Sequence, residues 1–187
     1  MSYKTDWSEL SVPACSALLV IDVQHGFVRP ATSHVPGRIS DLLEQRGTDF
    51  ALTVATRFRN ADGSNFRKLI RWERLDGPPD TDLDPAVESV EMVIDKDTYS
   101  AVPLLAPVLA ERNISTVFVC GIDTDVCVLQ NASDLFDLGL TPIVLADACG
   151  TTAGERLHGA ALDILRRTIG GAQVVTLGAT HARSAGT

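Results

Sequence analysis

The chain has 187 residues, of which 45% are hydrophobic, and its formal net charge is −8. This length fits a single domain with one continuous core, and the excess of acidic side chains disfavours a nucleic-acid partner. The N-terminal residues lack the charged and apolar pattern of a secretory leader, and no run approaches ~18 apolar residues. We therefore expect a cytoplasmic protein with no membrane partner.

Six apolar runs of strand length recur along the chain, with helix-compatible stretches between most of them. The expected strands are 17–23, 50–56, 90–94, 116–120, 142–146 and 172–176, and the expected helices are 38–45, 103–112, 125–138 and 153–168. Most runs are apolar throughout, as in strands covered on both faces. The alternation predicts an α/β fold: a doubly wound, mostly parallel six-stranded sheet with helices on both faces and functional loops at the carboxyl ends of the strands.

The polar segment 58–84 interrupts this alternation. It contains Gly63, Gly77, Pro78 and Pro79, which favour turns. We interpret it as an insertion or lid within one domain spanning 1–187, with a short helix around 66–74. Trp72 in this helix is a candidate lid residue or subunit contact. The tail after Leu177 is expected to be loosely held.

Two charged residues stand near the ends of apolar strands. Asp22 ends the strand in LLVIDVQ, and a buried carboxylate there must be paired or hydrogen-bonded. It either caps the following loop or points into the crevice where α/β proteins bind ligands. Lys96, in VIDKDTYSA, follows another strand; on its own it is typical of a solvated loop lysine.

The segment GIDTDVCVLQNASDLFDLG predicts a strand, a tight turn and a helix. Gly121 suits the exit from the strand, Thr124 and Asp125 are candidate helix N-caps, and Gly139 is a plausible helix stop. Cys127 would lie in the first helical turn, where unpaired N–H groups and the helix dipole lower a thiol pKa. The same N–H groups could bind an oxyanion.

The remaining cysteines and the histidines form no recognisable metal or redox motif. No CxxC pair occurs, so we expect reduced thiols that act as small buried or incidental side chains: Cys15, Cys120 and Cys149. His25 follows the Asp22 segment and is a candidate pocket residue. The other histidines are interpreted as surface or helix residues without metal-ligand spacing: His34, His158 and His181.

The segments LLVIDVQHGF, DKDTYSA and GIDTDVCVLQNASDLFDLG, followed by VLADACGT, together resemble the isochorismatase-like cysteine hydrolases over roughly 17–176. That family includes isochorismatases, nicotinamidases, N-carbamoylsarcosine amidohydrolases and ureidoacrylate-type amidohydrolases. The resemblance implies a catalytic triad of Asp22, Lys96 and Cys127, in which Cys127 is the nucleophile, Asp22 moves its proton and Lys96 balances the charge. It also implies a cis peptide between Ile122 and Asp123, and an oxyanion hole from the backbone N–H groups of Asp123 and Cys127.

The chain departs from the family pattern at two places. Nicotinamidases hold a metal near the second strand with an Asp-x-His arrangement, whereas TRFRN at 56–60 has neither residue, so we expect no metal and no cofactor. Asp123 stands where small apolar residues are common in the family. Its carboxylate could raise the pKa of the thiol or select a cationic or hydrogen-bond-donating substrate. Four residues beside the motifs are candidate substrate contacts: Phe27, Arg57, Tyr99 and Val128.

The leading hypothesis is a metal-independent cysteine hydrolase that cleaves a C–N bond in a small amide, carbamoyl or ureido compound through a covalent Cys127 intermediate. By resemblance we expect a homo-oligomer, a dimer or a tetramer. One alternative is isochorismatase-type hydrolysis of a vinyl ether, in which Cys127 would be dispensable. Another is a non-catalytic binding or assembly module on the same fold.

Overall fold

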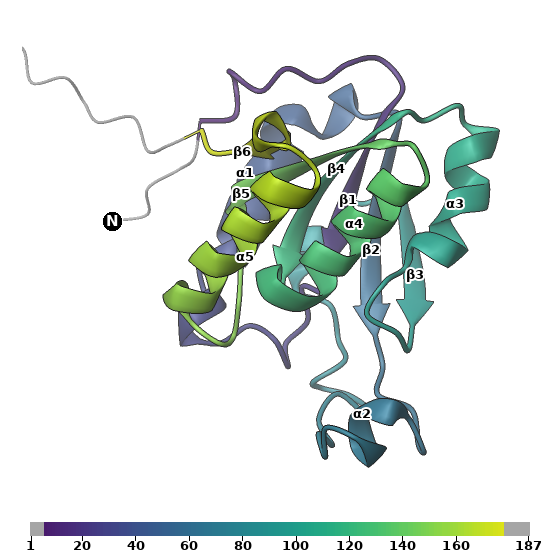
Figure 1. The fold of residues 1–187 in the computed structure, drawn as a ribbon, viewed down its shortest axis with the longest axis vertical. Helices are drawn as coiled ribbons and strands as arrows, with labels where there is room; N and C mark the ends of the chain where they lie inside the picture. Colours follow the sequence, from purple (N-terminus) through teal and green to yellow (C-terminus); the bar gives the residue numbers. More distant parts are fainter. Residues whose placement is uncertain (1–5, 178–187) are drawn as a thin grey trace, which may run out of the picture.

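The computed structural model describes residues 6–177, so the expectations for the tail after Leu177 and for His181 lie outside the described residues. One sheet organises the molecule, with strands in the order β3-β2-β1-β4-β5-β6 and every pairing parallel (Figure 1). Its strands are β1 (Ser16–Ile21), β2 (Leu52–Phe58), β3 (Met92–Lys96), β4 (Thr116–Ile122), β5 (Thr141–Gly150) and β6 (Val174–Val175). The predicted fold class is confirmed.

Four longer helices cover the two faces of the sheet. Helix α1 (Val35–Arg46) packs on one face, and α3 (Val102–Glu111), α4 (Leu129–Asp137) and α5 (Glu155–Thr168) lie on the other (Figure 1). Short 3-10 helices occupy 30–32, 47–49, 85–87 and 171–173, and a π-helical turn, Thr124–Val128, precedes α4. None of the helices in 6–177 is long and apolar enough to cross a membrane.

Backbone dihedrals explain where the observed elements end earlier than expected. β1 ends at Ile21 because Asp22 has φ 47°, which is incompatible with an extended strand. The expected helix at 66–74 is only α2 (Asn65–Lys68), and the positive φ of Arg71 (57°) ends any helical continuation. Lys96 is the last residue of β3, not a loop residue beyond it.

The core is built on the central strands. All six residues of β1 are buried, as expected of a strand with helices on both sides. The edge strand β3 instead alternates between partly buried and exposed residues up to its last residue, Lys96, which is buried. Gly121 lets β1 and β4 approach closely, since its φ is 119° and a Cβ there would collide with the backbone of Ile21. Because β1 and β4 are neighbours whose connections run in opposite directions, their carboxyl ends form the crevice at the switch point of the sheet.

The segment between β2 and β3 projects beyond the carboxyl edge of the sheet (Figure 1). Gln24 holds its base: the amide donates to the carbonyls of Phe58 and Thr81 and accepts from the Phe58 N–H. Asn60, which is 1% exposed, donates to the carbonyls of Trp72 and Arg74 and thereby folds the segment back on itself. The insertion therefore has a defined conformation, in which the Trp72 ring packs against Phe66.

Candidate active site

Asp22 is fixed directly after β1 by its neighbour on β2. The hydroxyl of Thr56 donates to Asp22 Oδ1 at 2.6 Å, and it accepts from the Asp22 N–H at 3.1 Å. The Asp22 side chain is fully buried. A buried carboxylate is strongly disfavoured without partners, so its orientation is set by the groups that bind it. Thr56 is a site residue that the sequence analysis missed, because nothing distinguishes one threonine in an apolar strand.

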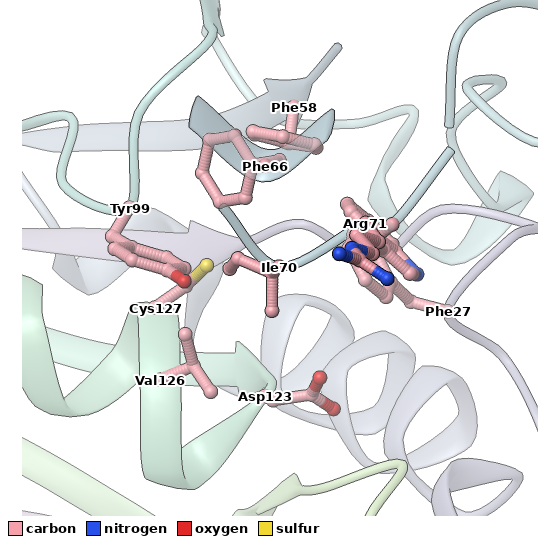
Figure 2. A pocket seen from close by; sticks show the side chains of 10 residues that line it. Phe27, Phe58, Phe66, Ile70, Arg71, Tyr99, Asp123, Val126 and Cys127 are labelled. Carbon is pink, nitrogen blue, oxygen red and sulfur yellow. The ribbon is translucent and has the colours of Figure 1, made fainter. Parts of the chain in front are cut away.

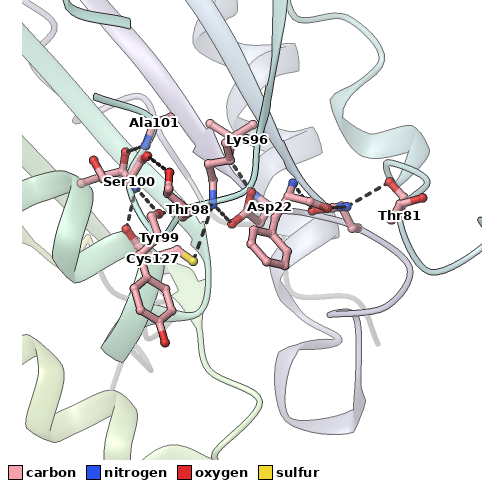
Figure 3. A network of polar contacts seen from close by, with 12 residues as sticks. Asp22, Thr81, Lys96, Thr98, Tyr99, Ser100, Ala101 and Cys127 are labelled. Atoms are coloured by element: carbon pink, nitrogen blue, oxygen red, sulfur yellow. Dashed lines mark hydrogen bonds and ion pairs between the residues drawn. The ribbon is translucent and has the colours of Figure 1, made fainter. Parts of the chain in front are cut away.

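Lys96 reaches from β3 to the same point (Figure 3). Its Nζ lies 2.7 Å from Asp22 Oδ2 and donates to the carbonyls of Thr98 at 3.0 Å and Tyr99 at 3.2 Å. The same atom lies 3.8 Å from Cys127 Sγ. Burial lowers the pKa of Lys96, but the Asp22 carboxylate and Cys127 outweigh burial and raise the pKa above its ordinary value. The structure thus brings Asp22, Lys96 and Cys127 together around a charged ammonium group.

Cys127 lies in the π-helical turn that follows β4, not in a regular α-helical turn. The N-cap of this turn is Asp123, without a side-chain cap, so the expected caps are wrong: Thr124 instead bonds to His158 Nδ1 at 2.8 Å. Asn131, fully buried on α4, donates to the carbonyls of Cys127 at 2.7 Å and Tyr99 at 3.1 Å. This amide therefore ties the π-helical turn that contains Cys127 to the loop that follows Lys96.

Burial determines the protonation of the thiol. It raises the pKa of Cys127 well above its ordinary value; the Asp22 carboxylate raises it further, and the Lys96 ammonium lowers it. The expectation that the helix terminus would lower this pKa is therefore wrong, because desolvation outweighs the stabilising groups. This environment therefore favours the thiol over the thiolate.

Asp123 borders the site on the other side of Cys127. The peptide bond between Ile122 and Asp123 is cis, and the Asp123 N–H has no hydrogen-bond acceptor among residues 6–177. The carboxylate accepts from the Thr152 N–H at 2.6 Å and from the Thr152 hydroxyl at 3.0 Å. Burial raises the pKa of Asp123 to about 6, although both hydrogen bonds from Thr152 lower it.

A cavity of about 280 Å³ opens above Cys127 (Figure 2). Its walls are largely aromatic, and one stacked pair, Phe27 and Trp72, has ring centroids 6.0 Å apart. Small-molecule sites are typically concave and apolar with a few placed polar groups. The cavity is lined by Phe27, Phe58, Phe66, Ile70, Arg71, Trp72, Tyr99, Asp123, Val126 and Cys127.

The candidate substrate contacts divide between cavity and structure. Phe27 and Tyr99 line the cavity, as the contact hypothesis requires. Arg57 does not; its guanidinium pairs with Asp95 at 2.6 Å on the neighbouring edge strand. Val128 is fully buried in the core, and its neighbour Val126 lines the cavity instead. The expectations for Arg57 and Val128 are corrected, because each side chain points away from the cavity.

The histidines and the other cysteines stand outside this cavity. His25 is exposed, and His34 bonds to the Cys149 carbonyl at 3.1 Å. Cys120 and Cys149 are buried as expected, whereas Cys15 is exposed. The part of the chain that the structure describes contains no group of three or more potential metal-binding side chains. The residues at the family's metal position do not fit a cation either, since Thr56 binds Asp22 and Arg57 is itself positively charged.

A thiol, a carboxylate and an ammonium group that meet below an aromatic cavity, at the switch point of a doubly wound sheet, define an α/β enzyme for a small molecule. The Isochorismatase domain family matches residues 16–178 of the chain. The chain therefore belongs to the isochorismatase family, and it is a hydrolase of that family.

Two relatives agree with this assignment, and a solved structure has the same fold. The chain is 31% identical to a nicotinamidase of Acinetobacter baylyi, over 71% of this chain and 80% of that protein. It is 30% identical to a nicotinamidase/pyrazinamidase of Mycobacterium tuberculosis, over 80% of this chain and 94% of that protein. An isochorismatase-like hydrolase from Alkaliphilus metalliredigens has the same fold, with a TM-score of 0.75 at 22% identity over 83% of this chain and 92% of that one.

Proposed function

We propose that the protein hydrolyses the C–N bond of a small amide, carbamoyl or ureido compound through a covalent intermediate on Cys127, without a metal ion. One observation carries the proposal: at the floor of the cavity, Cys127 Sγ lies 3.8 Å from Lys96 Nζ, which lies 2.7 Å from Asp22 Oδ2. A nucleophile, a base and a fixed positive charge are the parts that acyl transfer through sulfur requires.

The first half of the reaction acylates the thiol. Asp22 takes the Cys127 proton as Sγ attacks the carbonyl carbon, and the carbonyl oxygen becomes an oxyanion. The backbone N–H groups of Asp123 and Cys127 receive this oxyanion, since preorganised donors stabilise charge that develops in the transition state. The C–N bond then breaks, and Asp22 passes the proton to the leaving nitrogen. An amide leaves a thioester on Cys127, and a carbamoyl or ureido compound leaves a thiocarbamate.

The second half of the reaction releases the product. Asp22, again a carboxylate, takes a proton from water, and the hydroxide oxygen adds to the carbonyl carbon of the intermediate. The C–S bond breaks, and the proton returns to the sulfur. Lys96 remains protonated throughout, because its ion pair with Asp22 holds its charge in a buried site. Each turnover consumes one water and leaves Cys127 as a thiol.

Two observations favour C–N bonds as substrates and a reaction without metal. The relatives from Acinetobacter baylyi and Mycobacterium tuberculosis are named as nicotinamidases, so the family includes enzymes for non-peptide amides. At the position where nicotinamidases hold a metal, Thr56 of this chain binds Asp22 and Arg57 binds Asp95. We therefore assign the chemistry to the chain's own side chains.

Ammonia release from a panel of small amides, carbamoyl compounds and ureido acids, in metal-free buffer with a chelator, tests the proposal. With the best substrate, Cys127→Ala should lose at least about 1,000-fold in kcat/KM, because Cys127 supplies the only thiol among the residues that line the cavity. Cys15→Ala removes an exposed thiol outside the cavity and serves as the matched control. Undiminished turnover by Cys127→Ala would refute the mechanism, and its persistence on a vinyl ether would favour the isochorismatase-type reaction.

A further inference from the structure

The cavity has two chemically different sides. Cys127 and Tyr99 lie on one side. In Figure 2 the Asp123 carboxylate points away from Cys127 Sγ, toward the other side, on which Arg71 is drawn. Among the residues that line the cavity, only Asp123 and Arg71 carry a charged side chain. The proposed reaction uses the Asp123 backbone N–H but assigns no task to its carboxylate or to Arg71.

The Asp123 carboxylate is held in place and still has acceptor capacity. Thr152 anchors both oxygens, one through its N–H and the other through its hydroxyl. An ionised carboxylate has about four lone-pair sites, so two hydrogen bonds leave about two acceptor sites for a ligand. The anchoring fixes the direction of these acceptors, as a specificity contact requires.

Arg71 supplies the complementary donor. Its side chain lines the cavity, and it forms no ion pair or side-chain hydrogen bond with any residue between 6 and 177. In particular, Arg71 and Asp123 do not pair with each other across the cavity. Its backbone, with φ 57°, lies between the exposed Ile70 and Trp72 of the aromatic wall. A ligand could therefore engage both charges without first breaking an ion pair.

We infer that the substrate carries a second polar group, remote from the reacting C–N bond, that presents N–H donors to the Asp123 carboxylate and an oxygen acceptor to the Arg71 guanidinium. A carboxamide or ureido group offers both on one plane. The inference rests on the proposed function, because it takes the reacting carbonyl to lie at Cys127. It adds a substrate class: flat molecules with a reacting amide at one end and an amide or urea at the other.

Charge balance argues for a neutral second group. The opposite charges of Asp123 and Arg71 offset each other, so a cation would gain from one and be repelled by the other. An isolated charge would also lose its hydration among aromatic walls, at a cost that a neutral hydrogen-bonding group avoids. The stacked pair of Phe27 and Trp72 favours a flat body between the two ends.

Calorimetric titration of the Cys127→Ala protein, which cannot turn the ligands over by the proposed route, tests the inference with four benzamides. Benzamide has no second group, 3-acetylbenzamide adds an acceptor, 3-carbamoylbenzoate adds an anionic acceptor, and isophthalamide adds donors and an acceptor together. A hydrogen bond to a charged group contributes about 1.5 kcal/mol or more, which is about tenfold in affinity. Isophthalamide should therefore bind at least about tenfold more tightly than each of the other three.

Two further variants in the same background locate the effect. Asp123→Ala and Arg71→Met should each reduce the isophthalamide-to-benzamide affinity ratio several-fold, whereas the surface controls Asp137→Ala and Arg156→Met should leave it unchanged. If Asp123→Ala fails to fold, Arg71→Met alone decides the result. The Arg71 side chain is exposed, so its replacement should not prevent folding. Equal affinities, no binding of isophthalamide, or a ratio insensitive to both variants would overturn the inference. Ammonia release by the wild-type protein would then still support the proposed function.

Discussion

Replacing Lys96 with methionine perturbs the centre of the site with little change in side-chain volume. The variant leaves the Asp22 carboxylate, fully buried in the wild type, without its ammonium partner. It also removes the ammonium donor from the carbonyls of Thr98 and Tyr99, although the Tyr99 carbonyl keeps the Asn131 amide as a donor. Removing one partner of a buried ion pair costs about 3–5 kcal/mol, since the other charge stays desolvated. We expect the free energy of unfolding at pH 7 to fall by about that amount, and the C–N hydrolase activity to be lost.

Urea denaturation followed by circular dichroism measures the change, with kcat/KM from ammonia release measured in parallel. The matched control is the double variant Asp22→Asn, Lys96→Met, which removes both charges. It should recover about 1–2 kcal/mol relative to Lys96→Met, because the uncompensated carboxylate is gone, but should remain inactive. A loss below about 1 kcal/mol in Lys96→Met, or a double variant less stable than the single one, would refute the assignment of a buried, mutually dependent pair.

Two other predictions concern residues that hold the site in place. Burial raises the pKa of Asp123 from 3.8 to about 6, so its contribution to stability is complete below pH 3.8 and is lost as pH rises through about 6. Urea denaturation at each pH should show that the free energy of unfolding of the wild type falls by about 3 kcal/mol relative to Asp123→Asn between pH 3.5 and 7. Parallel plots of unfolding free energy against pH for the two proteins would contradict the raised pKa. Asn131→Ala leaves the Ala101 N–H without its side-chain acceptor and removes one donor from each of the Tyr99 and Cys127 carbonyls. Urea denaturation should therefore show a free energy of unfolding lower by about 2–4 kcal/mol. Asn131→Asp should recover part of the loss, because it retains the acceptor for the Ala101 N–H. Full stability in Asn131→Ala would contradict a stabilising role for these three contacts.

Periodicity was sufficient for the fold, whereas the family resemblance was needed to single out the three central residues. The apolar runs predicted the strands because a parallel sheet buries both faces, so each buried strand is itself a continuous apolar run in the sequence. Asp22, Lys96 and Cys127 were candidates because each interrupts or follows such a run at the carboxyl edge, but this position alone did not distinguish them from ordinary loop or core residues. Family resemblance then linked the three residues, whose separation in sequence gives no physical indication of contact.

The direction in which a side chain points could not be predicted from the local sequence pattern. Arg57 and Val128 adjoin motif residues, yet one pairs with Asp95 on the edge strand and the other packs in the core. Thr56 and Asn131 were missed for the opposite reason: each is an ordinary residue in its own element, and its role depends on partners more than 30 positions away. Sequence adjacency to a motif is therefore weaker evidence than a register position, because successive residues of a strand face opposite sides of the sheet.

The protonation of Cys127 connects the buried ion pair to the chemistry. A thiol whose pKa is raised by burial is a poor nucleophile until a base removes its proton, and a carboxylate alone would raise that pKa further. Lys96 opposes both effects, since its ammonium group lies within 4 Å of each partner: 2.7 Å from Asp22 Oδ2 and 3.8 Å from Cys127 Sγ. In the proposed mechanism, moving the proton from sulfur to the carboxylate transfers negative charge between two neighbours of the same cation. The proposal thus gives the buried lysine at the end of β3 a task, because its fixed ammonium group compensates the negative charge on either neighbour.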